Sequence, residues 1–323
     1  MSALADCGCA IRRVSGLALA GLAVVVAAAA SGAPAVASKA ESPPGVLVGV
    51  GLHRLHIHCI GRGSPTVVFE SGLGGTSLDW VRVQPEVSRF TRACSYDRAG
   101  YGWSERGPEP RHADRIAGEL DRLLLHANVP PPYLLVGHSF GGLAIRLFAA
   151  RNERRTVAGL VLVDATHEHQ FQRMESAGVR TPMAPTGRRF VISNHWLVPS
   201  ALPESLKPLA QRLALARKAI RTLYGELGSL RHSARQVGAI RRAPEAPVIV
   251  LARGPRPDAV DGHDGTWLDL QRELAETMKN GSFRVVSGSG HYIHLDRPER
   301  VVGAIRTIVD RYRIGPASVA DRR

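Results

Sequence analysis

The sequence predicts a doubly wound α/β fold with a helical insertion, and three patterns carry this prediction. Segments with helical periodicity alternate with short, continuously apolar runs, as strands buried on both faces of a mainly parallel sheet would require. This alternation favours right-handed crossover connections. It stops between residues 165 and 243, where helical patches, prolines and many arginines take its place. The apolar runs are 66–69, 93–96, 133–136, 160–163, 248–251 and 283–286.

The remaining elements follow from the same periodicities. Residues 52–60 alternate like an amphipathic strand, and residues 114–125, 142–150 and 298–312 have helical spacing with charges opposite the apolar side. The 323 residues suffice for one large domain that carries an insertion. We therefore expect a core of residues 52–164 and 244–313, a helical cap of residues 165–243 and a tail of residues 314–323.

The amino-terminal segment has the composition of an export signal. Arg12 and Arg13 precede an apolar run over residues 14–30, and Ala35-Val36-Ala37 offers a small-residue cleavage site. We expect a signal peptide over residues 1–37, a linker over residues 38–51, and a secreted or cell-envelope protein. An uncleaved membrane anchor is the alternative, although the apolar run is short and rich in alanine for a span.

Charge and cysteine content restrict the partners. Lys and Arg number 42 against 28 Asp and Glu, a formal net charge of +14. The basic residues are scattered, which disfavours nucleic-acid binding and favours at most peripheral contact with anionic membranes or cell walls. Cys59 and Cys94 both lie in strand-like runs. An isolated pair in an exported protein suggests a disulfide, and two buried thiols are the alternative.

The strongest chemical signal is the segment Gly137-His138-Ser139-Phe140-Gly141, placed between a buried strand and a helix. It matches the G-x-S-x-G nucleophile elbow, in which the serine occupies a strained strand-to-helix turn. Glycines are required where the backbones crowd around that turn. The following helix directs its amino terminus towards an oxyanion, and the Phe140 backbone N–H can donate to it.

With three further motifs, the elbow makes residues 52–312 resemble the α/β-hydrolase superfamily, most closely its exported bacterial members. The further motifs are Glu-Ser-Gly-Leu-Gly-Gly at 70–75, Asp-Arg-Ala-Gly-Tyr-Gly-Trp-Ser at 97–104 and Gly-Ser-Gly-His at 288–291. The resemblance implies that the Leu73 N–H is the second oxyanion donor, and that Asp97 and Arg98 brace neighbouring loops. Ser71 stands where many relatives have histidine, which leaves the hydrogen bonding of that turn open.

The general base expected from the resemblance is His291, in the loop after the last strand. The acid that would orient it stays open. Asp164 ends the strand over 160–163, where its carboxylate would face the same crevice as the elbow. In many relatives the acid follows the next strand instead, and that loop offers Asp258, Asp261 and Asp264.

These residues predict an enzyme that hydrolyses a small-molecule substrate, most simply a carboxylic ester, through an acyl-enzyme. By the resemblance, a serine nucleophile argues against the epoxide-hydrolase and dehalogenase branches, which have aspartate there. The alternatives are an aminopeptidase-like or carbon–carbon bond hydrolase, or a non-catalytic binding protein on the same fold. Neither a nucleotide loop nor a zinc motif occurs, so no cofactor or metal is expected. We interpret His53, His56 and His58 as strand-surface histidines rather than metal ligands.

Overall fold

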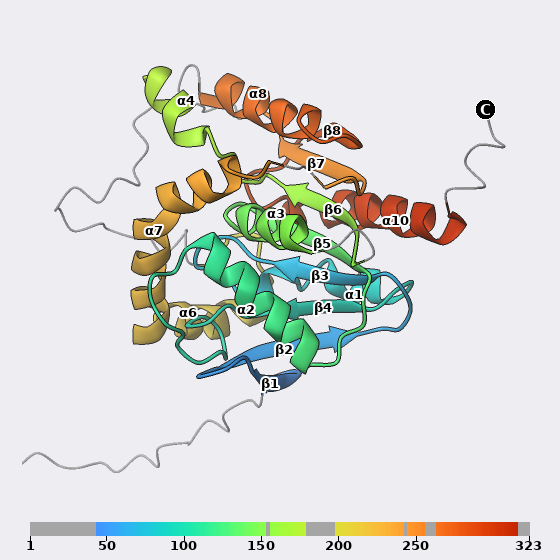
Figure 1. The fold of residues 1–323 in the computed structure, drawn as a ribbon. Coiled ribbons are helices and arrows are strands. Elements are labelled where there is room, and N and C mark those ends of the chain that lie inside the picture. Colours follow the sequence, from blue (N-terminus) through green and yellow to red (C-terminus); the bar gives the residue numbers. More distant parts are fainter. Residues whose placement is uncertain (1–42, 153–155, 179–197, 242–243, 256–262, 316–323) are drawn as a thin grey trace, which may run out of the picture. The chain divides into compact units, whose positions relative to one another are not determined.

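The computed structural model describes residues 43–152, 156–178, 198–241, 244–255 and 263–315. Within them, eight strands form one sheet in the order β1-β2-β4-β3-β5-β6-β7-β8 (Figure 1). The β1–β2 and β2–β4 pairs are antiparallel, and every other pair is parallel. The strands are β1 (Val46–Gly49), β2 (Arg54–Ile60), β3 (Thr66–Glu70), β4 (Ala93–Tyr96), β5 (Tyr133–His138), β6 (Val157–Val163), β7 (Val248–Arg253) and β8 (Gly281–Val286). The predicted fold class, a mostly parallel sheet between helices, is confirmed.

Helices cover both faces of this sheet (Figure 1). On one face, α2 (Ala113–His126), α3 (Gly141–Arg151) and α8 (His263–Glu276) enclose one apolar core. On the other face, α1 (Gln84–Ser88) and α10 (Pro298–Ile314) enclose a second core, next to the 3-10 helix η1 (Ser77–Trp80) and α9 (Ile293–Asp296). The strands between these layers are buried on both sides, which explains why their sequences read as continuous rather than alternating apolar runs.

The expected linker over residues 38–51 is wrong in its last part. Val46–Gly49 forms β1, an edge strand paired antiparallel with β2 from Val46 opposite Ile57 to Gly49 opposite Arg54. A run of three apolar residues is too short to stand out as a strand in the sequence. The backbone hydrogen bonds offered by β2 stabilise the extended conformation.

The interpretation of the strand histidines is also wrong for two of the three. His56 is fully buried, with Nδ1 2.9 Å from Asp97 Oδ2, and His53 is 7% exposed, with Nε2 3.5 Å from Glu119 Oε1. The sequence suggested a solvated strand face. Because His53 packs against α2 and His56 against the turn after β4, both meet buried carboxylates instead.

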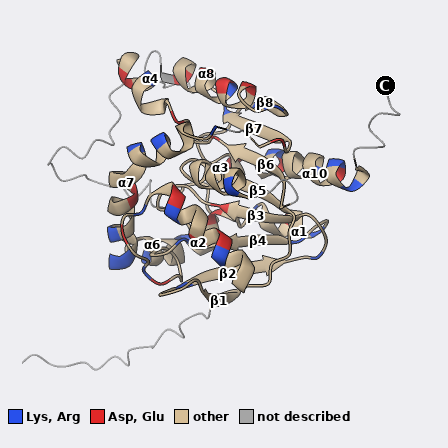
Figure 2. Cartoon of the chain, viewed as in Figure 1, with Lys and Arg blue, Asp and Glu red and all other residues tan. Residues whose placement is uncertain are grey.

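The described parts of the insertion contain helices joined by turns, namely α4 (Gln170–Ser176), η2 (Glu204–Leu206), α6 (Lys207–Ala214) and α7 (Arg217–Gly238). Among the described residues, no helix combines the length and the apolar composition that a bilayer crossing demands. Lys and Arg occur on α2, α7 and α10, with acidic residues between them (Figure 2).

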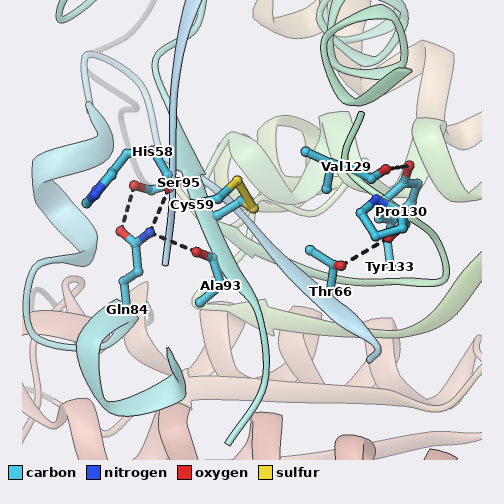
Figure 3. Close-up of a disulfide and its surroundings, with 10 residues drawn as sticks. His58, Cys59, Thr66, Gln84, Ala93, Ser95, Val129, Pro130 and Tyr133 are labelled. Carbon is cyan, nitrogen blue, oxygen red and sulfur yellow. Dashed lines mark hydrogen bonds between the residues drawn. A yellow bond between two sulfur atoms is a disulfide. The ribbon is translucent and has the colours of Figure 1, made fainter. Parts of the chain in front are cut away.

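Cys59 and Cys94 form a disulfide, the first of the two alternatives left open by the sequence. Cys59 on β2 lies directly opposite Cys94 on β4, and their sulfur atoms are bonded (Figure 3). Next to this bridge, the Gln84 amide donates to the carbonyl oxygens of His58 and Ala93, at 2.8 and 3.0 Å. The bridge and these hydrogen bonds fasten the antiparallel part of the sheet to the parallel part.

Candidate active site

Ser139 lies at the carboxyl end of β5, in the turn that leads into α3. Its φ of +50° is in the left-handed region, which a side chain rarely adopts unless the surroundings impose it. Its N–H donates to Val163 O at 3.1 Å, and its carbonyl accepts from Gly142 N and Thr166 N, both at 3.0 Å. These bonds from three sides fix the strained conformation and hold the serine at the sheet edge.

The 71–75 turn after β3 packs directly against this elbow. A Cβ on Gly72 would lie 2.8 Å from His138 Nδ1 and 3.2 Å from the Ser139 Cβ. A Cβ on Gly141 would lie 2.6 Å from the Glu70 carbonyl oxygen. Glycine at both positions therefore allows the 71–75 turn and the elbow to pack against each other.

The Leu73 and Phe140 N–H groups remain available in this arrangement. Among the described turn and loop hydrogen bonds, neither N–H is a donor. Ser71, which replaces the histidine of many relatives, is engaged within its own turn. Its hydroxyl donates to Thr76 O at 2.8 Å and accepts from Trp80 Nε1 at 3.0 Å. The Ser71 hydroxyl, in place of the histidine of many relatives, thus closes the turn with its own hydrogen bonds. The Leu73 N–H is left to donate to a substrate.

His291 and Asp164 lie side by side, with Nδ1 2.6 Å from Oδ2. Asp164 directly follows β6 at a φ of +43°, and its side chain is fully buried. Its Oδ1 accepts from the Arg253 N–H at 3.0 Å and from Trp267 Nε1 at 2.7 Å, and the Arg253 guanidinium is 3.6 Å from Oδ2. The carboxylate is therefore held in one orientation, with one oxygen left for the imidazole.

The other acids considered from the sequence do not contact His291 in the described part of the chain. Asp264 accepts from Arg253 Nη2 at 2.9 Å, on the far side of that guanidinium from Asp164. Asp258 and Asp261 lie outside the described residues. The structure thus places the Asp164–His291 pair next to the Ser139 turn, because Val163 O accepts the Ser139 N–H and the His291 carbonyl oxygen lies 3.0 Å from His138 Nε2.

Two further histidines, His138 and His294, lie near His291 and are neutral. His138 Nε2 lies 3.0 Å from the His291 carbonyl oxygen, so that nitrogen carries the proton and donates. Its ring centroid is 4.6 Å from that of His291 and 4.5 Å from that of His294. Burial lowers the pKa of His138 well below its ordinary value and, assisted by the nearby His291, lowers the pKa of His294 to about 3. The His291 side chain, at 40% exposed, is the solvent-accessible member of this group.

We expect His294→Phe to remove part of the acid sensitivity of the fold. The His294 ring contacts Trp80 at 4.5 Å, and neither ring nitrogen has a hydrogen-bond partner in the described structure. The unfolded chain binds a proton below the ordinary pKa of 6.5, whereas the native ring stays neutral until about pH 3. Its contribution to stability is therefore complete above pH 6.5 and is lost as the pH falls towards 3.

The measurement is urea unfolding of both proteins across this range. The free energy of unfolding of His294→Phe, relative to wild type, should rise by about 1.4 kcal/mol for each pH unit lost. Parallel stability curves for the two proteins would show that His294 titrates alike in the native and unfolded states.

Three residues around the site had no assigned part in the sequence analysis. Arg253 could have been noticed as a basic residue ending the buried strand β7, next to the strand β6 that Asp164 follows. His138 lies inside the elbow motif, but nothing in the motif indicates its contact with the His291 backbone. Trp267, on α8, carries no local signal at all, since its contact with Asp164 spans 103 positions of sequence.

One cluster in the described part of the chain has ligand chemistry. His167, His169 and Glu273 offer atoms within 4.8 Å of one another. However, His167 Nδ1 accepts the His169 backbone N–H at 3.0 Å, and Arg173 Nη1 donates to Glu273 at 3.1 Å. A metal ion would have to compete with these contacts, so we assign it none.

Comparisons with known proteins agree with this architecture. The model of the alpha/beta hydrolase family matches residues 67–304. The uncharacterized protein YqjL of Bacillus subtilis is 27% identical over 254 residues, which cover 77% of this chain and 85% of YqjL. Several other curated relatives are longer proteins, of which the chain spans about a fifth.

Solved structures share the fold at low identity. The haloalkane dehalogenase DbeA of Bradyrhizobium elkani aligns with a TM-score of 0.62 at 21% identity, covering 81% of this chain and 97% of that chain. A thermophilic esterase of Thermogutta terrifontis aligns with a TM-score of 0.55 at 21% identity, covering 81% and 96%.

Proposed function

The chain belongs to the alpha/beta hydrolase family, and from this premise we propose that it is an exported serine hydrolase that cleaves carboxylic esters through an acyl-enzyme. The observation that carries the proposal is the 2.6 Å contact between His291 Nδ1 and Asp164 Oδ2 beside the strained Ser139 turn. With Nδ1 on the carboxylate, Nε2 is the nitrogen left to accept the serine proton.

In the first half of the reaction, Ser139 Oγ attacks the ester carbonyl while His291 takes its proton. The Leu73 and Phe140 N–H groups donate to the oxyanion that forms. Asp164 holds the imidazole in the required tautomer and stabilises the imidazolium. His291 then gives its proton to the departing alkoxide, which leaves the acyl group on Ser139.

Water completes the cycle. His291 deprotonates a water molecule that attacks the acyl-enzyme, the same two N–H groups hold the second oxyanion, and the proton returns to Ser139 as the acid leaves. The neutral state of His138 and His294 matters here, because it places no second positive charge beside the imidazolium that forms on His291.

The serine supports hydrolysis of an acyl bond over the chemistry named for some fold relatives. DbeA is a haloalkane dehalogenase, and the resemblance described above associates that branch with an aspartate nucleophile, where this chain has Ser139. Export is supported by the composition of residues 1–37 and by the Cys59–Cys94 disulfide, since such bonds persist in oxidising compartments.

A chain-length series of p-nitrophenyl esters, from acetate to palmitate, tests the proposal. We expect turnover with a length optimum set by the cap. Amino-acid p-nitroanilides in parallel test the aminopeptidase-like alternative. Hydrolysis of the anilides without hydrolysis of any ester would move the substrate class to peptides, and inertness towards both would contradict an acyl hydrolase.

A further inference from the structure

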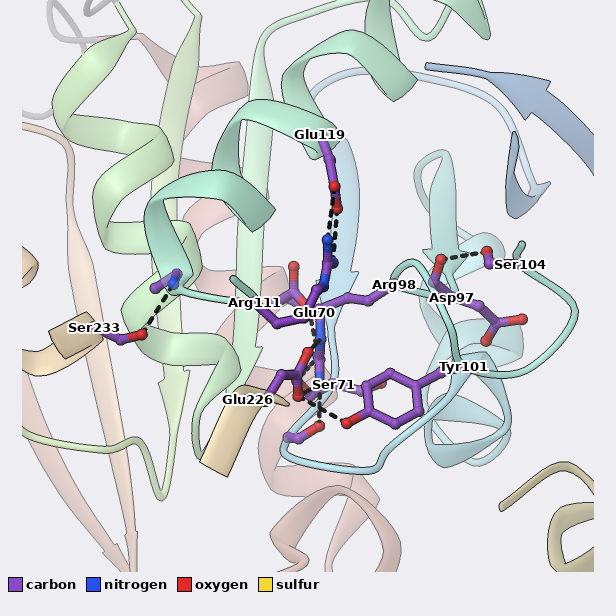
Figure 4. Close-up of polar contacts among 12 residues, drawn as sticks. Glu70, Ser71, Asp97, Arg98, Tyr101, Ser104, Arg111, Glu119, Glu226 and Ser233 are labelled. Carbon is purple, nitrogen blue, oxygen red and sulfur yellow. Dashed lines mark hydrogen bonds and ion pairs between the residues drawn. The ribbon is translucent and has the colours of Figure 1, made fainter. Parts of the chain in front are cut away.

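The Arg98 guanidinium, in the turn after β4, contacts the 71–75 turn that carries one of the predicted oxyanion donors. Its side chain is 1% exposed. Nη1 donates to the Ser71 carbonyl oxygen at 2.5 Å, and Nη2 donates to the Gly72 carbonyl oxygen at 2.7 Å (Figure 4). A single planar fork thus holds two successive carbonyls of the 71–75 turn.

The second of these contacts determines where the Leu73 N–H points. The Gly72 carbonyl and the Leu73 N–H belong to the same peptide unit, and in a planar trans peptide these groups point in opposite directions. Fixing the Gly72 oxygen on Arg98 therefore directs the Leu73 N–H away from the guanidinium. The elbow lies against this turn, since a Cβ on Gly72 would be 3.2 Å from the Ser139 Cβ.

Arg98 also contacts the residue that carries the other predicted donor. Its guanidinium carbon is 5.5 Å from the centre of the Phe140 ring, which is fully buried. The ring and the guanidinium are in the range of a cation–π contact. One side chain therefore contacts both the peptide unit that carries the Leu73 N–H, through the Gly72 oxygen, and the ring of Phe140.

The guanidinium is in turn held by the cap. Arg98 Nε and Nη2 donate to the two oxygens of Glu226 on α7, at 2.8 and 3.0 Å, and the Tyr101 hydroxyl donates to the same carboxylate at 2.9 Å. Glu226 is fully buried. Nη1 also donates to Glu70 Oε1 at 2.8 Å, so the cation is paired with one carboxylate from the core and one from the cap.

Other contacts seat α7 on the same turn. Lys218 donates to the carbonyl oxygens of Gly102 and Ser104, at 2.8 and 2.7 Å. Gly100 has a φ of +94°, and a Cβ there would collide with Thr222. The 97–104 turn is therefore shaped to receive this cap helix, and Arg98 extends from it to the catalytic edge of the sheet.

We propose that Arg98 is a positioning residue that orients the oxyanion donors. Through the Arg98–Glu226 ion pair, this orientation depends on the docking of cap helix α7. The inference rests on the proposed serine hydrolase function. It adds a residue in the cap, distant from the triad in sequence, that sets the geometry of the oxyanion hole.

Glu226→Gln tests the inference, because it keeps the shape and removes the charge that anchors Arg98. The matched control is Glu119→Gln, which also removes a buried carboxylate from a two-pronged arginine pair. Arg111 donates to Glu119 at 2.7 and 2.8 Å, without contact to the 71–75 turn. Tyr101→Phe is a milder second variant that removes one hydrogen bond to Glu226 and no charge.

The first readout is hydrogen–deuterium exchange of the peptide containing residues 70–76, which needs no substrate. We expect faster exchange in Glu226→Gln and, to a smaller extent, in Tyr101→Phe, with no change in Glu119→Gln. Unchanged exchange of this peptide in both cap-network variants would overturn the inference, whether or not the protein hydrolyses esters.

The second readout is the rate ratio between an ester and its thiono analogue, whose sulfur accepts hydrogen bonds poorly. Glu226→Gln should lower kcat on the ester about 10- to 100-fold, with KM nearly unchanged, and lower the ratio about 10-fold. A general loss of stability would slow both substrates alike. Ester turnover with an unchanged ratio would overturn the inference and leave the proposed function standing, whereas an inert wild type would overturn the function alone.

Discussion

Asp164→Asn is expected to lower kcat on the best ester about 10⁴-fold, with little effect on folding. The amide would present an N–H to His291 Nδ1, where the carboxylate presents Oδ2 at 2.6 Å. The imidazole would then carry its proton on Nε2, the nitrogen that must accept the Ser139 proton. Asparagine tolerates the left-handed backbone that Asp164 adopts at a φ of +43°, so the substitution isolates the electrostatic effect. Steady-state kinetics, with circular dichroism to verify folding, measure it.

Asp264→Asn is the matched control for the orienting acid. Asp264 contacts the opposite side of Arg253, at 2.9 Å from Nη2, and was one of the acids considered from the sequence. We expect its replacement to change kcat by less than about 10-fold, because Asp164 keeps its bonds from the Arg253 N–H and from Trp267. A loss as large as that of Asp164→Asn would instead assign the acid to Asp264, in the first turn of α8.

Ser139→Ala is expected to reduce ester turnover about 10⁵- to 10⁶-fold, the largest effect in the molecule. The substitution removes the nucleophilic oxygen and leaves both oxyanion donors in place. Alanine is no more strained than serine at a φ of +50°, so stability should be retained. The measurement is initial-rate kinetics with enough enzyme to resolve a residual rate.

Ser88→Ala provides the comparison for Ser139→Ala. The Ser88 hydroxyl donates to Pro85 O at 2.7 Å on an exposed helix end, away from the elbow. Wild-type kinetics are expected for it. If Ser139→Ala retained more than about a tenth of wild-type turnover, hydrolysis would not pass through this serine.

The parts of the fold that sequence could predict are those with a local physical cause. Strands buried on both faces need continuous apolar runs, and the elbow needs small residues around a strained serine. Both requirements are visible within a few positions, so the sheet and Ser139 could be recognised. His291 could be predicted for a similar reason, since it follows the last strand in a glycine-rich loop.

The parts that sequence could not decide depend on contacts between distant loops. Asp164 and the acids after β7 are equivalent by local pattern, and only the path of the chain brings Asp164 to His291. Glu226 lies 128 positions from Arg98, and nothing near it signals a buried partner. The His56 prediction was wrong because burial was judged from one strand alone, without its neighbours.

Intact-mass analysis after reaction with a fluorophosphonate shows whether Ser139 is an activated nucleophile without assuming a substrate. We expect one phosphonyl group on the wild-type chain, located on Ser139 by peptide mapping. We expect no label on Ser139→Ala and strongly slowed labelling of Asp164→Asn. An unlabelled wild type, or a label that persists in Ser139→Ala, would show that Ser139 is not the activated nucleophile.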